Sequence, residues 1–267
     1  MTEREAIALR LLLALVSVGC GGPAHHVEAP PQAAAPSPPA QPAAPQMRVG
    51  GQLGSIDPGA VTKTFNQLLP ALQQCHIDGL KRIRYLGGAV KLVLRIGEDG
   101  RARYAYLEDS SLGDHDAEAC MMHAATGIAW PRPDGGEAEV KNSFEFDPPA
   151  GSPAQEAWGS DSIAAQLLER QAKIRSCRGQ VQGAFKATAY VVRGTAPKKP
   201  PPHMRPKHPK PKGTLSPSPD LRGRILAVGI APPGPEGNDA VDCLAAVVLE
   251  MRVPNPNTSA AKVTFSL

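Results

Sequence analysis

Residues 88–100, Gly-Ala-Val-Lys-Leu-Val-Leu-Arg-Ile-Gly-Glu-Asp-Gly, carry the clearest fold signal in the chain. Apolar side chains alternate there with mostly polar ones, which predicts a strand with one buried face: Val90, Leu92, Leu94 and Ile96. The stretch Gly97-Glu98-Asp99-Gly100 is a turn signal. We therefore expect residues 101–107 to return as an antiparallel partner strand.

A helix is expected on each side of this hairpin. The first follows Asp57-Pro58, a typical helix start, and has apolar residues at helical spacing: Val61, Phe65, Leu68, Leu72 and Cys75. The second surrounds Cys120, and a closing strand places Val140, Phe144 and Phe146 on one side. This order predicts an α+β unit, in which two helices cover one face of a three-stranded antiparallel sheet.

The same order of elements occurs a second time. Adding 102 to the positions of the first helix gives Ile163, Leu167, Arg170, Ile174 and Cys177, so the cysteine is reproduced. Further strands are predicted by two alternating sets: Phe185, Ala187, Ala189 and Val191, then Leu226, Val228 and Ile230. A helix around Cys243 and a strand with Ala261, Val263, Phe265 and Leu267 on one face complete the copy.

We therefore predict two copies of one unit, at residues 52–147 and 160–267, joined by a linker at 148–159. Each copy also has a Pro-x-Pro after its second cysteine, at Pro131-Arg132-Pro133 and Pro254-Asn255-Pro256. Two unrelated small α+β modules are the alternative.

The second copy is interrupted at residues 196–220, where nine prolines accompany a basic set of side chains: Lys198, Lys199, Arg205, Lys207, Lys210 and Lys212. Such a loop can attract anionic polymers, so these six residues are a candidate anion-binding site. A solvated spacer is the simpler alternative.

The amino terminus has the pattern of a secretory signal. Arg4 and Arg10 precede a short apolar run, and Ser17-Val18-Gly19-Cys20 follows, which is similar to a bacterial lipoprotein processing site. The run is too short to span a membrane. We expect residues 1–20 to be the signal peptide and Cys20 to carry the lipid, with Gly21 favouring the outer membrane facing the periplasm. Ordinary secretion, or a wrongly assigned start, with Cys20 incidental is the alternative.

Residues 21–51 are expected to form a disordered N-terminal linker. Within them, positions 23–46 hold eight prolines and eight alanines and almost no large apolar side chain, which favours extended polyproline backbone. His25 and His26 lie in this stretch and are better explained as solvated residues than as metal ligands.

Overall composition limits the possible classes of protein. Proline (29) and glycine (26) are abundant and aromatic residues make up only 4% of the 267 residues, which excludes one large aromatic-rich enzyme core. A hydrophobic content of 42% excludes full disorder. The formal net charge is +4. Small folded units joined by linkers fit these values.

Residues ~56–147 resemble the AgmX/PglI C-terminal domain of myxobacterial proteins, a relative of the TonB carboxy-terminal domain. The resemblance is carried by the helix that ends in Cys75, the hairpin at 88–100, the segment Asp109-Ser110-Ser111-Leu112-Gly113-Asp114, Cys120, Trp130-Pro131-Arg132-Pro133-Asp134-Gly135-Gly136 and Phe144-Glu145-Phe146. It implies a non-enzymatic interaction domain of the cell envelope, often linked to motility or transport machinery. The second copy lacks the Ser-Ser-Leu-Gly-Asp segment and the tryptophan.

The five cysteines fit this picture of an exported protein, because disulfides persist outside the cytoplasm. With Cys20 taking lipid, the repeat alignment pairs Cys75 with Cys120 and Cys177 with Cys243. A thiol nucleophile or metal site involving the neighbouring His76 and His123 is the alternative, but the chain has no Cys-x-x-Cys.

No catalytic or cofactor-binding pattern stands out. Asp114-His115-Asp116 offers acid and base groups, but it precedes a helix, so we expect Asp114 to be its N-cap. Phosphate-binding glycine loops, nucleophile elbows and His-Glu-x-x-His are missing from the sequence. We expect no enzyme activity, no cofactor, no metal and no nucleic-acid partner.

The leading functional hypothesis is an envelope lipoprotein that binds other envelope proteins as an adaptor. Its three-stranded sheets leave edges to which a partner strand can add. The candidate edges are 137–146 and 260–267, with Val140, Phe144, Phe146, Val263 and Phe265 as candidate partner-binding residues. The alternative is a structural tether that binds cell-wall or anionic surface polymer through the basic loop.

Overall fold

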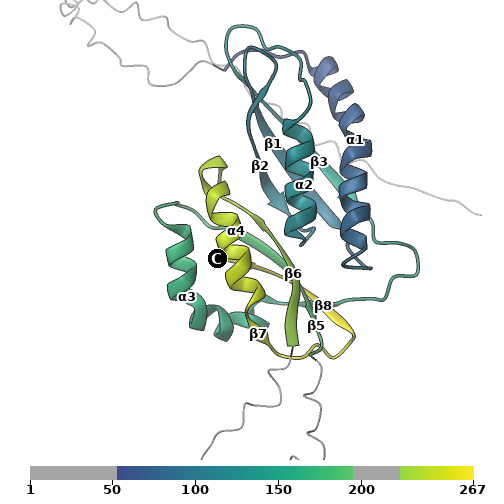
Figure 1. Ribbon diagram of the computed structural model, residues 1–267, viewed down its shortest axis with the longest axis vertical. Helices are drawn as coiled ribbons and strands as arrows, with labels where there is room; N and C mark the ends of the chain where they lie inside the picture. Colours follow the sequence, from purple (N-terminus) through teal and green to yellow (C-terminus); the bar gives the residue numbers. More distant parts are fainter. Residues whose placement is uncertain (1–52, 195–222) are drawn as a thin grey trace, which may run out of the picture. The chain divides into compact units, whose positions relative to one another are not determined.

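Two copies of an α+β unit make up the described part of the chain (Figure 1). The structure is a computed structural model, and it describes residues 53–194 and 223–267, all within one compact unit, Val49–Leu267. The expected signal peptide, Cys20, the Pro/Ala-rich linker and the basic loop with its six candidate residues lie outside the described residues. Within the described ranges, no helix combines the length and the apolar character needed to cross a membrane.

The first copy has the predicted order of elements. Its helices are α1 (Pro58–Leu80) and α2 (His115–Thr126), and its strands are β1 (Gly88–Ile96), β2 (Ala102–Ser110) and β3 (Ala138–Phe146). The sheet order is β2-β1-β3, and both strand pairs are antiparallel. Both helices lie on the same face of the sheet in Figure 1, and the predicted inward side chains of β1 are buried beneath them.

The second copy has the predicted three central strands and two more. A 3₁₀ turn (Ser160–Ile163) leads into α3 (Ala164–Arg178), and α4 spans Asn238–Leu249. The strands are β4 (Glu156–Trp158), β5 (Lys186–Val192), β6 (Gly223–Ala231), β7 (Arg252–Val253) and β8 (Ala260–Ser266). Their order is β4-β8-β5-β6-β7, with β4 parallel to β8. The prediction of three strands is therefore correct for the centre of this sheet but omits its two short outer strands.

The segment 148–159, the predicted linker, also contacts both copies. The side-chain amide of Gln155 donates to the Tyr85 carbonyl (3.3 Å), and the next three residues form β4 on the second sheet. The segment Glu156-Ala157-Trp158 is too short to show strand periodicity, so its pairing could not be predicted from the sequence.

The first helix begins as its sequence predicts. The Asp57 carboxylate accepts hydrogen bonds from the backbone N–H groups of Gly59 (3.4 Å) and Ala60 (2.8 Å), and Pro58 occupies the first turn. These bonds satisfy donors that the first turn of a helix leaves unpaired. The predicted turn after β1 is also confirmed, because Gly100 N–H donates to the Gly97 carbonyl (2.9 Å), with φ at Gly100 of +75°.

The predicted inward set on β6 is wrong at one position. Val228 and Ile230 belong to the second core, but the pairing shifts between Tyr190↔Ala227 and Val191↔Ile225, which leaves Leu226 unpaired. A β-bulge of this kind reverses the alternation, so that side chains before the bulge and side chains after it exchange faces of the sheet. Ile225 therefore takes the inward place, and Leu226 packs against the first core.

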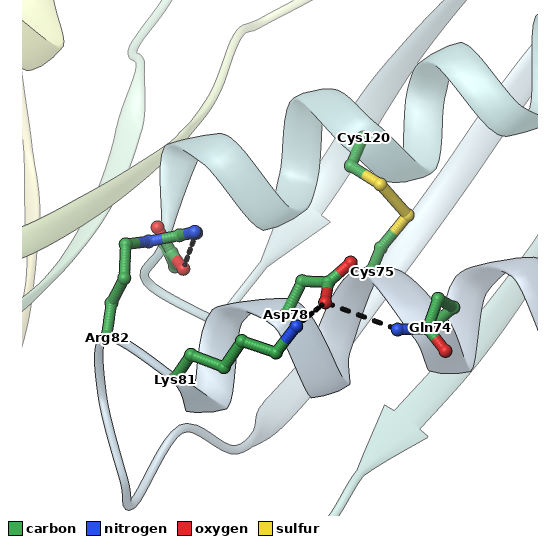
Figure 2. Close-up of a disulfide and its surroundings, with 7 residues drawn as sticks. Gln74, Cys75, Asp78, Lys81, Arg82 and Cys120 are labelled. Carbon is green, nitrogen blue, oxygen red and sulfur yellow. Dashed lines mark hydrogen bonds and ion pairs between the residues drawn. A yellow bond between two sulfur atoms is a disulfide. The ribbon is translucent and has the colours of Figure 1, made fainter.

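Both predicted disulfides are present. Cys75 is bonded to Cys120, and Cys177 to Cys243, so each bridge joins the two helices of one copy. Figure 2 shows the first bridge between α1 and α2, with the Asp78 carboxylate accepting from Gln74 (3.2 Å) and Lys81 (2.7 Å) nearby. The alternative roles of these four cysteines as nucleophiles or metal ligands are thereby excluded for the bonded state.

The two copies also contact each other, although the sequence suggested separate cores. The Glu118 side chain of α2 is buried and accepts hydrogen bonds from Ser110 Oγ (2.6 Å), Gly113 N–H (3.3 Å) and, in the second copy, Ile230 N–H (3.1 Å). A Cβ at Gly229 would overlap this carboxylate, so glycine is required there.

A tyrosine makes a second polar link between the copies. The Tyr190 hydroxyl donates to the Gly87 carbonyl (3.0 Å) and accepts from the Gly87 N–H (3.2 Å). Lys262 also donates to that carbonyl (2.6 Å), and its ammonium lies 5.1 Å from the centre of the Tyr190 ring. Burial raises the pKa of Tyr190 to about 12 and lowers the pKa of Lys262 to about 8. These polar groups hold the copies in a fixed register.

Candidate functional site

Strand β3 is an open edge of the first sheet within the described residues. All nine of its residues pair with β1, from Ile96↔Ala138 to Gly88↔Phe146, without a bulge. The other edge, β2, is covered by the second copy: Asn238 donates to the Ala105 carbonyl (2.8 Å) and Thr188 to the Ser110 carbonyl (3.3 Å). A partner strand can therefore add to this sheet at β3.

Backbone groups of alternate residues point out of this edge. The Glu137 carbonyl, just before β3, accepts from Gly54 N–H (2.8 Å) on the side away from β1. Because this direction alternates along a strand, the N–H and C=O groups of residues 139, 141, 143 and 145 face outward as well. These groups are the hydrogen-bonding template that strand addition uses.

A groove of about 370 Å³ lies between this edge and the start of α1. Ile56, Pro58, Val61 and Phe65 supply its apolar side, and Val140 contributes from β3. Thr62 of α1 and Glu139, Lys141 and Asn142 of β3 also line it, so the lining is polar as well as apolar. A strand added to β3 would direct alternate side chains into this groove, so at least one of them must be apolar.

The floor of the groove is held by aromatic packing. Phe65 meets Trp130 edge-on (ring centres 4.8 Å apart) and Phe144 at a tilt (5.9 Å). The Trp130 indole N–H donates to the Ala125 carbonyl at the end of α2 (3.0 Å). Trp130, which belongs to the segment that resembles the AgmX/PglI domain, therefore supports the residue Phe65 that lines the groove.

The candidate side chains on β3 face the core and not a partner. Val140 and Phe146 are buried and Phe144 is half-buried, because the alternation that makes a strand amphipathic turns these side chains toward the helices. Only Val140 also lines the groove. The predicted strand is an open edge within the described residues, but its accessible groups are the outward backbone and, beside it, the groove residues of α1.

The second candidate edge is partly closed. Strand β4 pairs with β8 at Glu156↔Ala261, Ala157↔Lys262 and Trp158↔Val263, so Val263 has strands on both sides. Val263 and Phe265 are also buried in the second core. The expectation of a free edge over 260–267 is therefore wrong for residues 261–263.

One position explains why the two copies differ here. The segment before α1 pairs with the residues just ahead of β3, with Ser55 bridging Asp134, and a Cβ at Gly54 would lie 2.5 Å from the Gly136 carbonyl oxygen. The offset of 102 places Glu156 at the position of Gly54. A glutamate does not fit that close approach, and the equivalent segment of the second copy lies along β8 as β4.

The acid and base groups at 114–116 form ion pairs. Asp114 stands at the N-cap position of α2, but its carboxylate makes no capping hydrogen bond and instead pairs with Arg82 (2.5 Å). Burial raises the pKa of Asp114, and Arg82 opposes that shift. His115 Nε2 lies 2.8 Å from Asp242 of the second copy. Asp114 is therefore at the predicted N-cap position, but its side chain does not make the expected capping hydrogen bond.

Residues 53–194 and 223–267 contain no group of three or more His, Cys, Asp or Glu side chains placed to hold a metal ion. Their buried side-chain nitrogen and oxygen atoms all have hydrogen-bond partners. The groove beside β3 is the candidate site of this part of the chain.

Comparison with known proteins found no family model, no curated protein and no solved structure that matches the chain. The resemblance to the AgmX/PglI C-terminal domain accordingly stays a prediction.

Proposed function

We propose that this protein is a non-enzymatic adaptor of the cell envelope that binds an extended segment of another envelope protein by strand addition to β3. The single observation that carries the proposal is the open nine-residue edge of β3 beside a groove that is lined in part by apolar side chains. Such a site combines backbone hydrogen bonds, which supply affinity, with a pocket for alternate side chains, which supplies specificity.

The second copy supports the proposal from within the same chain. Register and the repeated Pro-x-Pro place Ala261–Val263 of β8 at the positions of Ala138–Val140 of β3. At those positions β8 binds an extended segment of the chain itself, β4, and the half-buried Trp158 packs against the second core. An edge of this unit can therefore hold an added strand and its apolar side chain.

The groove specifies the chemistry of the partner. Its lining combines apolar side chains, mainly in or near α1, with the polar or charged residues Thr62, Glu139, Lys141 and Asn142. A segment with an apolar side chain facing α1 and without a large net charge fits best. Attachment through lipidated Cys20, export and a role in a motility or transport assembly belong to the same proposal, and they rest on the sequence patterns alone.

The test uses a photoreactive amino acid at Thr62, an exposed residue beside the groove, in the full chain in cells that produce it. We expect a discrete crosslinked product with an envelope protein. Lys141→Pro should reduce it at least about tenfold, because proline removes an outward N–H and is tolerated at strand edges. Lys141→Ala is the matched control, since it keeps the N–H, and it should crosslink as strongly as the parent.

Equal crosslinking by Lys141→Pro and Lys141→Ala would contradict strand addition at β3. Deleting residues 198–212 separates the adaptor from the polymer tether. The adaptor proposal predicts an unchanged crosslinked product after this deletion, whereas a tether that acts through the basic loop would lose its binding.

A further inference from the structure

Strand β4 occupies the edge of β8 with very few contacts. It has three residues, and it pairs only with Ala261–Val263 of β8. Beyond Trp158 the chain turns away through Gly159 into the 3₁₀ turn Ser160–Ile163. The last part of β8 is therefore left without a neighbour on this side in the described structure.

Two side chains hold β4 in place. Trp158 is half-buried and packs against the second core. The Glu156 carboxylate accepts from the backbone N–H of Asn257 (2.8 Å) and from its side-chain amide (2.9 Å). Glu156 is itself partly accessible, so these bonds compete with water and contribute modestly.

The uncovered part of β8 offers further backbone groups. Leu267 exchanges hydrogen bonds with Phe185, which continues the pairing toward β5: Leu267 N–H donates at 2.9 Å and Phe185 N–H at 3.4 Å. By alternation, residues 261, 263 and 265 also face β5, whereas residues 262, 264 and 266 face outward. A strand longer than β4 could thus continue pairing to Ser266.

Beside this uncovered end lies an apolar groove of about 430 Å³ between α3 and β8. Leu167, Ile174 and Leu267 line it, and Leu168 at its side is 70% exposed. In a strand parallel to β8, the second residue after the Trp158 position would face inward beside Phe265 and reach this groove. The chain's own β4 ends too early to fill it.

We propose that the edge of β8 is a second strand-accepting site that β4 keeps closed, and that a longer extended segment opens it by displacing β4. The segment has a large apolar side chain at the place of Trp158 and a further apolar side chain two residues later. The inference rests on the proposed function in one respect, since both sites use strand addition.

Competition with β4 sets the affinity of this site. Both ends of β4 are tethered nearby, so its local concentration is on the order of millimolar and a competing segment binds weakly while β4 is intact. A longer segment regains binding energy from the extra backbone pairs and from the groove. Weakening β4 must therefore tighten binding without any change in the acceptor strand.

The probe is a labelled peptide, Pro-Ala-Gln-Glu-Ala-Trp-Thr-Leu-Thr-Leu, which copies residues 153–158 and continues as a strand with leucines on the inward side. A control peptide carries aspartate in place of both leucines. The full exported chain with Lys141→Pro is the parent, so that β3 cannot bind the probe. The opened variant adds Glu156→Ala and Trp158→Ala, and Trp158→Phe is the conservative control.

We expect the opened variant to bind the probe at least about tenfold more tightly than the parent, because the tethered competitor is lost. Amide exchange at Thr264 and Ser266 should slow on binding, the Trp158→Phe control should bind like the parent, and the aspartate peptide should bind neither protein.

A folded opened variant that binds no more tightly than the parent would overturn the proposal, and so would slowed exchange confined to other strands. If the double replacement unfolds the second copy, Glu156→Ala alone leaves the core intact and must still tighten binding, and its failure to do so also overturns the proposal. Because β3 is blocked throughout, these outcomes are independent of whether the adaptor proposal for β3 holds.

Discussion

Replacing Cys75 and Cys120 together with alanine is expected to lower the free energy of unfolding by about 4 kcal/mol. The bridge closes a loop with a sequence separation of 45 residues and therefore restricts the unfolded chain. A loss of this size is a large share of the stability of a small domain. Urea unfolding of the oxidised parent and of the double variant measures it.

The second bridge provides the matched comparison. Cys177 and Cys243 are separated by 66 residues, and because loop entropy grows slowly with length, their replacement should cost about the same. Non-reducing peptide mapping should show both bridges in the parent. A change of less than about 1 kcal/mol in both double variants would contradict the structural role of the bridges.

Replacing Glu118 with leucine is expected to lower the free energy of unfolding by about 3 kcal/mol, since three buried donors lose their acceptor at about 1 kcal/mol or more each. These donors are Ser110 Oγ and the N–H groups of Gly113 and Ile230. The last belongs to the second copy, so the loss should loosen both copies. Urea unfolding followed by probes in each copy measures this effect.

Glu118→Gln is the control, and it adds a pH dependence. Burial raises the pKa of Glu118, and the hydrogen bonds from Ser110, Gly113 and Ile230 oppose but do not cancel this shift. As the pH rises above about 4.3, the unfolded glutamate loses its proton first. Protonated Glu118 stabilises the folded state. This contribution falls as the pH rises from about 4.3 to the pKa that Glu118 has in the folded protein.

Relative to the parent, the Gln variant should therefore become more stable as the pH rises from about 4.3 toward 7. Lys262, with a pKa of about 8, and Tyr190, with a pKa of about 12, stay mostly protonated over this range in both proteins, so the difference reports mainly on Glu118. If the parent instead became more stable than the Glu118→Gln variant as the pH rises over that range, the result would contradict the burial of the Glu118 carboxylate.

The sequence predicts the central architecture well, because each copy has long alternating strands and cysteines at matching places. The hairpin at 88–100 shows a two-residue period that only an amphipathic strand satisfies, and the Asp57-Pro58 start has a local physical cause. The disulfide pairing followed from the repeat, since the equivalent helices bring the equivalent cysteines together.

What could not be predicted depends on contacts between distant segments. The bulge at Leu226 is invisible in an alternating pattern, and β4 is too short to carry one. Glu118 looks like an ordinary acidic residue in the first turn of a helix, and only the approach of β6 shows that it is buried. Ile56 lines the groove but lies before α1. No sequence pattern identifies it, because its role depends on β3 lying beside it.

The adaptor account depends most directly on the outward N–H groups of Glu139 and Lys141 in β3, because the Ser143 N–H already donates to Asn142 Oδ1 (2.9 Å). Amide hydrogen exchange of the purified chain, alone and saturated with the partner captured by crosslinking at Thr62, tests them one by one. We predict that exchange at both positions slows at least about tenfold on binding, while Val140 and Asn142, which already face β1, change little. Unchanged exchange at Glu139 and Lys141 in the saturated complex would contradict strand addition at β3.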